Sequence, residues 1–239
     1  MSRVIAVYGS PESGKTVTAL KLAQEIYERK KNRVLFVSPD LTVPMMGYVF
    51  PHCKASELYS LGEVLDRTDI GKEDILKQIV TVKTMENFGY LGFKAGENRY
   101  SYPHPTEDKI TQLFARLREI AEYIVLDCVS DPADFISAMC LKEADDCLQI
   151  ISTDLKGMVY HLSNNAGITL KHRQTVLNIK EKDIVLATEE IGAVFGKTDF
   201  TLPYSFALKK QTYTGTLSER LSDPKYRKAM KTVARAVCP

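Results

Sequence analysis

The sequence predicts an α/β fold with a doubly wound, mostly parallel sheet and helices on both of its faces. An apolar run rich in β-branched residues, residues 4–7, ends at a glycine-containing loop. Helical periodicity follows over residues 16–30, and a second apolar run follows at residues 34–37. This succession of strand, loop, helix and strand is the βαβ unit of parallel sheets. Short, fully apolar runs are typical of strands that are buried on both faces.

The other elements follow from the same patterns along the chain. Further helices are expected at residues 56–65, 72–79, 106–123 and 226–237. Further strands are expected at residues 80–82, 88–93, 124–127, 148–151 and 176–177. Thr106 is placed to cap the helix that it precedes. Residues 96–105 contain glycine, asparagine, serine and two prolines, so we expect a surface loop there. No repeat, low-complexity tract or linker interrupts the pattern, and we expect one domain over residues 1–239.

Composition and charge exclude several classes of protein. The net charge of the 239 residues is only +2, so any nucleic-acid footprint would have to be local. The five cysteines form no C-x-x-C pair and are odd in number, which argues against a disulfide framework and a thiolate metal site. We expect buried, reduced thiols. The first apolar run is too short for a signal peptide, and no run approaches the roughly 20 apolar residues of a membrane span. We therefore expect a cytoplasmic protein.

The strongest motif lies directly after the first strand. Residues 9–16, GSPESGKT, fit the phosphate-binding pattern G-x-x-x-x-G-K-[ST]. In this P-loop, glycines let backbone amides curl around phosphate oxygens, and the following helix adds its N-terminal dipole. Lys15 would neutralise β- and γ-phosphate charge, and the Thr16 hydroxyl would bind Mg²⁺. The predicted nucleotide-binding residues of the loop are Gly9, Ser10, Pro11, Glu12, Ser13, Gly14, Lys15, Thr16 and Val17.

Two aspartates at predicted strand ends are candidates for the chemistry of this loop. Asp127 ends the apolar run at residues 124–127, where a P-loop protein needs a carboxylate for Mg²⁺. The alternative for Asp127 is a turn or capping residue. Asp40 follows the second strand at the same edge of the sheet, and we predict that Lys15 and Asp40 are the catalytic residues. An ordinary turn aspartate after Pro39 explains Asp40 nearly as well.

Several segments in order resemble the MinD/ParA group of P-loop ATPases. They are the P-loop, VLFVSPD, YIVLDCVSDP, EADDCLQIISTDLKG, TVLNIKEKD and LPYSFALKK. The resemblance implies a three-layer P-loop NTPase that binds ATP and Mg²⁺, forms a homodimer and works with a protein partner. It also implies that Asn178 reads the adenine and that Pro203 lies beside the base. Asn178 is followed by Ile-Lys-Glu rather than by a guanine-binding motif, so we expect ATP and not GTP.

Three departures from the family pattern bear on activity. Ser10 stands where many members carry a second lysine, and Pro11-Glu12 replaces a pair of glycines. Ser38 stands where the family has its first switch aspartate. Loss of a cation and a carboxylate predicts slow or absent hydrolysis, because phosphoryl transfer relies on positioned charge. Similar losses occur in the CpaE/TadZ-like branch, which favours a localisation or assembly factor for pili or secretion.

The C-terminal segment permits further interpretations. A stripe of Tyr226, Met230, Val233 and Val237 runs along a basic helix. Peripheral membrane contact is one reading, but packing on the domain explains a stripe without Phe, Leu or Trp better. Lys209-Lys210 and the basic helix are candidates for non-specific DNA binding, as in a DNA-partition ATPase. A metabolic P-loop kinase or ligase is a further alternative.

Overall fold

Eight strands of the described chain form one sheet in the order β3-β4-β2-β5-β1-β6-β7-β8. The computed structural model describes residues 2–164, 170–182 and 188–238. The strands are β1 (Arg3–Gly9), β2 (Val34–Ser38), β3 (Val80–Val82), β4 (Met85–Gly92), β5 (Tyr123–Asp127), β6 (Asp146–Ile151), β7 (Arg173–Asn178) and β8 (Phe200–Leu202). Only β3 pairs antiparallel among these strands; the other pairs are parallel. This confirms the predicted doubly wound, mostly parallel α/β fold.

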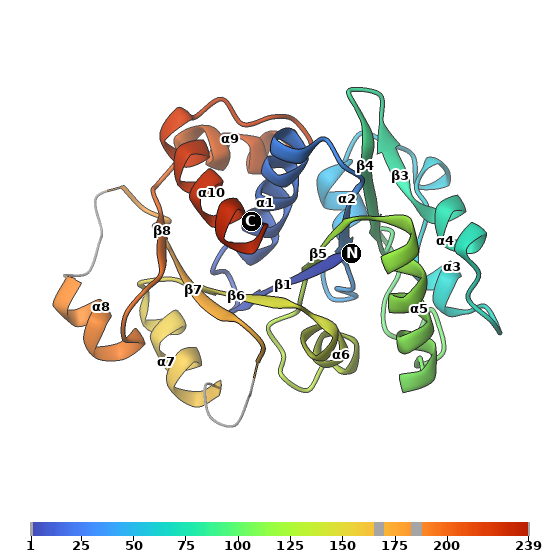
Figure 1. Ribbon diagram of the computed structural model, residues 1–239, viewed down its shortest axis with the longest axis horizontal. Helices are drawn as coiled ribbons and strands as arrows, with labels where there is room; N and C mark the ends of the chain where they lie inside the picture. The colour runs from blue at the N-terminus through green and yellow to red at the C-terminus, as the bar shows by residue number, and fades with distance from the viewer. Residues whose placement is uncertain (1, 165–169, 183–187, 239) are drawn as a thin grey trace.

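Helices lie on both faces of this sheet (Figure 1). They are α1 (Lys15–Lys30), α2 (Met45–Val49), α3 (Leu61–Leu65), α4 (Lys72–Gln78), α5 (Glu107–Ile120), α6 (Phe135–Glu143), α7 (Leu155–Asn164), α8 (Thr188–Phe195), α9 (Phe206–Thr214) and α10 (Pro224–Val237), with a short 3₁₀ turn at Ala55–Glu57. Figure 1 shows α1, α9 and α10 on one side of the strands and α5, α6 and α7 on the other. No helix within these described ranges is both long and apolar enough to cross a membrane.

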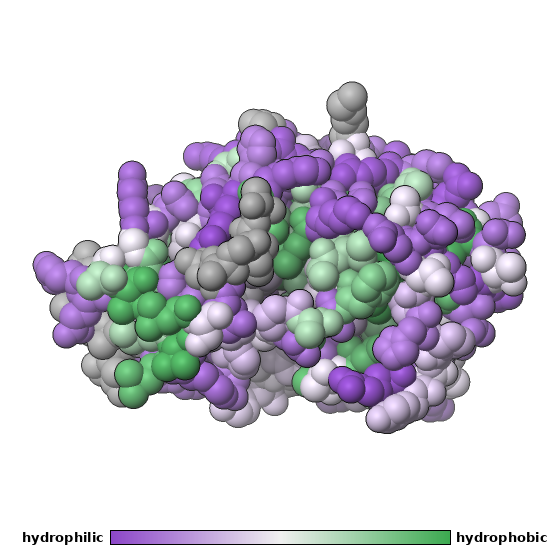
Figure 2. Space-filling view, turned by 90° about the horizontal axis from the view of Figure 1, so that it is seen from below, coloured by the Kyte–Doolittle hydropathy of each residue, from purple (hydrophilic) through white to green (hydrophobic). Residues whose placement is uncertain are grey.

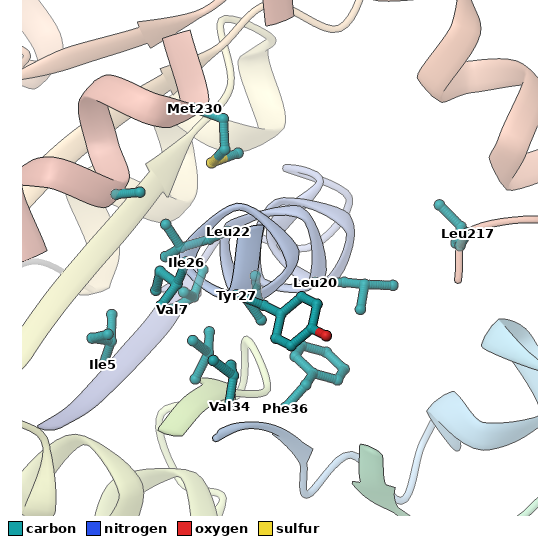
Figure 3. Packing of buried hydrophobic residues seen from close by; sticks show 14 of the residues in the cluster. Ile5, Val7, Leu20, Leu22, Ile26, Tyr27, Val34, Phe36, Leu217 and Met230 are labelled. Atoms are coloured by element: carbon teal, nitrogen blue, oxygen red, sulfur yellow. The ribbon is translucent and has the colours of Figure 1, made fainter. Parts of the chain in front are cut away.

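Alternating residues of β1 point into two separate cores. Ile5 and Val7 face α1, where Figure 3 shows Val7 beside Ile26. Val4 and Ala6 point to the opposite face and pack in the core beneath α5 and α6. Burial on both faces explains why this strand is apolar at every position. The central strand is therefore fixed from both sides, and the loop that follows it starts from a rigid base.

The stripe on α10 packs against α1 in the first of these cores. The four stripe residues are at most 2% exposed: Tyr226, Met230, Val233 and Val237. Figure 3 shows Met230 above Leu22 of α1. The prediction that this stripe packs on its own domain is confirmed, and its burial leaves no apolar face on α10 for membrane insertion.

Several element predictions were incomplete. Residues 56–65 do not form one helix, because Ser60 caps a new helix, α3, through a bond from the Gly62 amide to its hydroxyl. The helix predicted to reach residue 123 ends at Ile120, because Tyr123 already belongs to β5. The predicted loop at residues 96–105 contains no helix or strand, as expected. The elements that the patterns missed are α2, α6, α7, α8, α9 and β8.

The cysteines are all free, and four of the five are buried. Cys53 is exposed, so the expectation of buried thiols was wrong for this residue. It lies in the irregular segment after α2, where residues 51–54 are all exposed. The other four are Cys128, Cys140, Cys147 and Cys238.

Candidate functional site

The predicted P-loop connects the end of β1 to the start of α1, as the motif requires. Gly14 is the N-cap of α1 and has a φ of 84°, a left-handed conformation that disfavours side chains. A Cβ atom on Gly14 would also lie 2.5 Å from the Asn178 Nδ2 atom. A Cβ atom on Gly9 would overlap the backbone oxygen of Ile150 on the neighbouring strand β6. Glycine is therefore required at both ends of the loop.

Two serine side chains of the loop are buried and have no hydrogen-bond partner. Ser10 is 3% exposed and Ser13 is fully buried, and the Oγ atom of each is unpartnered. An unpaired buried hydroxyl is unfavourable by about 1–3 kcal/mol. Two of them beside a helix N-terminus form a polar cradle that a bound anion would satisfy.

Asp127 lies at the C-terminal end of β5, directly beside the P-loop strand. Its backbone pairs with Val7 of β1. The Ser38 hydroxyl donates a hydrogen bond of 3.1 Å to Asp127 Oδ2, whereas the buried Oδ1 has no partner. Ser38 ends β2 on the other side of β5. Parallel pairing thus brings two strand ends and the loop to the same edge of the sheet.

The electrostatics of Asp127 link it to the first residues of α1. Burial raises the pKa of Asp127 to about 6, while the positive charge of Lys15, the nearby Thr16 hydroxyl and the hydrogen bond from Ser38 act in the opposite direction. The negative charge of Asp40 raises it further. The structure therefore gathers the residues predicted for phosphate charge, metal and catalysis around one buried carboxylate.

These side chains fit a magnesium ion. The unpartnered Asp127 oxygen and the Thr16 hydroxyl are the oxygen donors that Mg²⁺ prefers, and P-loop sites supply only one or two carboxylates because phosphates and waters complete the shell. In the described part of the chain, no group of three or more His, Cys, Asp and Glu side chains gathers to form a cage for a metal. The donor set thus suits a metal that arrives with a phosphate ligand.

Asp40 is both a turn residue and a residue of the cavity beside the P-loop, the two possibilities that its sequence position left open. Its Oδ1 atom accepts hydrogen bonds from the backbone amides of Thr42 and Val43, at 2.7 and 3.0 Å, so it stabilises the turn after β2. It also lines the cavity beside the P-loop, and its charge acts on Asp127. A role in positioning water stays a prediction.

A cavity of about 630 Å³ opens in front of the loop and helix α1. The predicted residues that line it are Glu12, Gly14, Lys15, Thr16, Val17, Asp40, Asn178 and Pro203. The other predicted residues, Gly9, Ser10, Pro11, Ser13 and Asp127, are not part of its lining. Ser10, Ser13 and Asp127 are buried, and Pro11 is exposed. The cavity is within the size range of small-molecule sites.

Asn178 connects this cavity to the loop. It ends β7 beside Leu202, the residue before Pro203. Its Nδ2 atom donates a hydrogen bond of 2.8 Å to the backbone oxygen of Ser13. The amide is therefore held against the P-loop at one end of the cavity, and its predicted contact with adenine remains untested.

Aromatic residues of the cavity wall were not predicted. Tyr48, Tyr204 and Tyr213 line it together with Leu208. Tyr204 directly follows Pro203, so the prediction that Pro203 lies beside the base could have been extended to Tyr204. Tyr48 and Tyr213 come from α2 and α9, two helices that the sequence patterns missed. Flat apolar rings suit the faces of a nucleotide base.

Charged residues from two later segments hold the unusual Glu12. Its backbone adopts a φ of 60°, and its exposed carboxylate pairs with Lys156 Nζ at 2.9 Å. Lys180 Nζ donates to the Glu12 backbone oxygen at 3.1 Å and pairs with Asp154 at 2.6 Å. Lys156 accordingly lowers the pKa of Glu12. These residues are far apart in the sequence, so the network could not be predicted from it. The network neutralises an acidic side chain beside the expected phosphates.

Comparison with known proteins gives a consistent fold. No protein-family model matches the sequence, and no curated protein matches it significantly. A ParA family ATPase from Chlorobium tepidum TLS superposes with a TM-score of 0.75 at 15% identity, covering 98% of both chains. The septum site-determining protein MinD from Pyrococcus horikoshii OT3, solved with Mg-ADP, gives 0.70 at 16% identity over 100% of this chain and 96% of its own.

A solved MinC:MinD cell division complex from Aquifex aeolicus extends this comparison. Its matching chain gives a TM-score of 0.71 at 15% identity, covering 98% of this chain and 95% of its own. The agreement extends over nearly the whole length of each structure, whereas sequence identity is low throughout. The chain therefore has the P-loop α/β fold of the ParA and MinD ATPases.

Proposed function

We propose that this protein is a MinD/ParA-type ATPase that binds Mg-ATP in the cavity beside its P-loop. The unpartnered, buried Oδ1 atom of Asp127, set beside Lys15 and Thr16, is the observation that carries this proposal. A buried carboxylate of this kind is unfavourable unless a cation reaches it. When bound, Mg²⁺ would be held by Thr16 and Asp127 and would neutralise phosphate charge.

Different residues of the chain would then bind the phosphates and the base of the nucleotide. Loop amides and Lys15 would bind the β- and γ-phosphates, and Gly14 would let the backbone approach them closely. Asn178 and Pro203 would lie at the base, with Tyr204 as an apolar neighbour. The absence of a guanine-binding motif after Asn178 supports ATP over GTP.

We propose that hydrolysis is slow. Ser10 offers no charge to the phosphates, and Ser38 is engaged with Asp127. Asp40 is the remaining carboxylate for positioning water, and one of its oxygens already holds a turn. Purified protein with Mg-ATP is expected to turn over far below the roughly 1–100 s⁻¹ of protein kinases. A wild-type rate within that range that disappears in the Lys15→Gln variant would refute slow hydrolysis.

The biological role that we propose is localisation or assembly through a nucleotide-dependent homodimer and a protein partner, in a pilus or secretion system. Three side chains of α7 form an exposed apolar stripe: Leu155, Val159 and Leu162 are 79%, 62% and 69% exposed. Figure 2 shows hydrophobic side chains gathered at the end of the molecule that carries α7 and α8. Such patches are typical of protein contacts. The solved MinC:MinD complex supports a protein partner for a chain of this fold.

The oligomeric state tests this role. Light scattering after size-exclusion chromatography is expected to report a monomer without nucleotide and a dimer with Mg-ATP, with no shift for Lys15→Gln. A monomer under all conditions would contradict the dimer. DNA-partition activity is the alternative, and it would appear as ATP-stimulated DNA binding that weakens with salt. Part of the basic surface is already engaged, because Lys209 pairs with Glu181 and Arg227 with Glu25.

A further inference from the structure

A second cavity lies on the opposite face of the sheet from α1. Its volume is about 490 Å³, and it opens between α6 and α7 beneath strands β1 and β6. Figure 1 shows both of these helices on the face away from α1 and α10. None of the residues predicted for the nucleotide lines it. It is therefore distinct from the P-loop cavity.

Buried polar side chains form part of this second cavity. Tyr8, Ser137, Gln149 and His161 line it and are each at most 8% exposed. Tyr8 and Gln149 are register partners on β1 and β6, so strand pairing fixes their separation. Polar groups on buried, rigid elements keep a fixed geometry, which specific ligand recognition requires.

Arg173 contributes a positive charge at the same place. Its Nη2 atom donates a hydrogen bond of 2.6 Å to Gln149 Oε1, which orients the guanidinium toward the polar floor. Burial raises the pKa of Tyr8, and the Arg173 charge partly offsets this rise. Burial also lowers the pKa of His161, and the Arg173 charge lowers it further. Tyr8 and His161 are thus neutral hydrogen-bonding groups that both face the field of one cation.

The charge balance of the lining favours an anion. Among the described residues of the lining, three are basic, Lys142, Lys171 and Arg173, and one, Asp131, carries a carboxylate. Lys142 is paired with Glu107 at 2.6 Å, outside the cavity lining. Arg173, held by its hydrogen bond to Gln149, is the cation directed at the polar floor of the cavity. A guanidinium is suited to carboxylates and phosphates, because its parallel N–H groups match their oxygens.

Apolar walls complete the site. Tyr160, Val129, Leu141 and Leu170 line the cavity around the polar groups. The Tyr160 hydroxyl donates a hydrogen bond of 2.7 Å to the backbone oxygen of Ser130, which anchors its ring. A ligand here would meet apolar surface along its body and a cation at one end. Mixed lining of this kind is typical of small-molecule sites.

We propose that this second cavity binds a small organic anion whose flat or aliphatic body carries a carboxylate or phosphate group directed at Arg173. The body would lie against Tyr160 and the aliphatic wall, and Tyr8 and Gln149 would donate or accept further hydrogen bonds. This function is additional to nucleotide binding and does not depend on it. The same cation serves carboxylates and phosphates, so the test separates the two.

Saturation-transfer NMR on the whole chain tests the proposal with four probes of similar size. Benzoate and phenyl phosphate carry the two kinds of anion, benzamide is neutral, and benzylamine is a cation. At least one anion is expected to bind at least about tenfold more tightly than benzamide, because only an anion can form a charge-paired hydrogen bond with Arg173. Excess Mg-ATP is expected not to displace it.

Three variants assign the signal to the cavity. Arg173→Gln is expected to weaken anion binding about tenfold or more, and Ala138→Phe, which fills the cavity from α6 without altering charge, to abolish it. Lys83→Gln removes the same charge from the exposed connection between β3 and β4, and is expected to bind as wild type. The proposal is overturned if neither anion binds or benzylamine binds best. It is equally overturned if Mg-ATP displaces the probe, or if a folded Ala138→Phe variant binds it unchanged.

Discussion

Replacing Asp127 by asparagine is expected to stabilise the protein without nucleotide and to remove its response to Mg-ATP. Burial holds the pKa of Asp127 at about 6, compared with an ordinary value of 3.8. The folded-state pKa lies above the unfolded one, so the folded chain retains a proton that the unfolded chain releases. The free energy of unfolding therefore falls as pH rises from about 4 to about 6, and stays lowered above that.

The size of this effect follows from the pKa of Asp127. Each pKa unit corresponds to about 1.4 kcal/mol, so ionised Asp127 lowers the free energy of unfolding by on the order of 3 kcal/mol above pH 6. Asparagine carries no charge and can still accept the hydrogen bond from Ser38. It therefore escapes the penalty of burying a charge, but it loses the carboxylate that would bind a metal ion.

Urea unfolding at several pH values measures this difference. The gain in stability of Asp127→Asn over wild type is expected to be near zero at pH 4 and on the order of 3 kcal/mol at pH 8. Mg-ATP is expected to raise the unfolding midpoint of wild type and not that of the variant. Asp69→Asn makes the same change at an exposed position and is expected to match wild type. A variant that is less stable at pH 8, or a difference that does not vary with pH, would refute the reasoning.

Three further predictions concern the loop and its support. Gly14→Ala is expected to reduce Mg-ATP binding in calorimetry by at least about tenfold and to destabilise the fold by about 1–2 kcal/mol, because of its φ of 84° and the Asn178 contact. Gly96→Ala, at a φ of 91° with open space around it, is the control and should leave binding unchanged. Met230→Ala is expected to lower the free energy of unfolding by about 2–5 kcal/mol. The control Lys231→Ala, on the exposed side of α10, should change it by less than about 0.5 kcal/mol. Equal effects of the two substitutions would contradict the packing of α10 on α1. In calorimetry, Glu12→Gln is expected to raise the affinity for Mg-ATP by less than about tenfold, and Lys156→Gln is expected to lower it. A higher affinity in Lys156→Gln would contradict the neutralising role of that lysine.

The sequence patterns were most informative where local chemistry alone determines structure. The strand at residues 4–7 and the helix after it follow from continuous apolarity and from helical spacing, and both were predicted correctly. Parallel strands place their carboxyl ends at one edge, so the proximity of Asp127 to the P-loop followed from the strand assignment alone. The packing of α10 could also be predicted, because its apolar stripe is confined to one face.

Tertiary contacts explain what could not be predicted. Helix α2 spans only five residues, Met45–Val49, and so is too short to show a period. The Glu12 network depends on Lys156 and Lys180, more than 140 residues away in the sequence. The second cavity depends on how far α6 and α7 stand apart, which no sequence pattern encodes. Such features arise from packing between elements and appear only once the topology is known.

Calorimetric titration of Mg-ATP into the purified protein tests the central claim most directly. Wild type and Lys83→Gln are expected to bind one nucleotide per chain, with binding dependent on Mg²⁺. Lys15→Gln is expected to show no heat of binding while keeping its circular dichroism spectrum. A wild-type protein that gives no binding heat with Mg-ATP, or a Lys15→Gln variant that binds as tightly as wild type, would contradict the account.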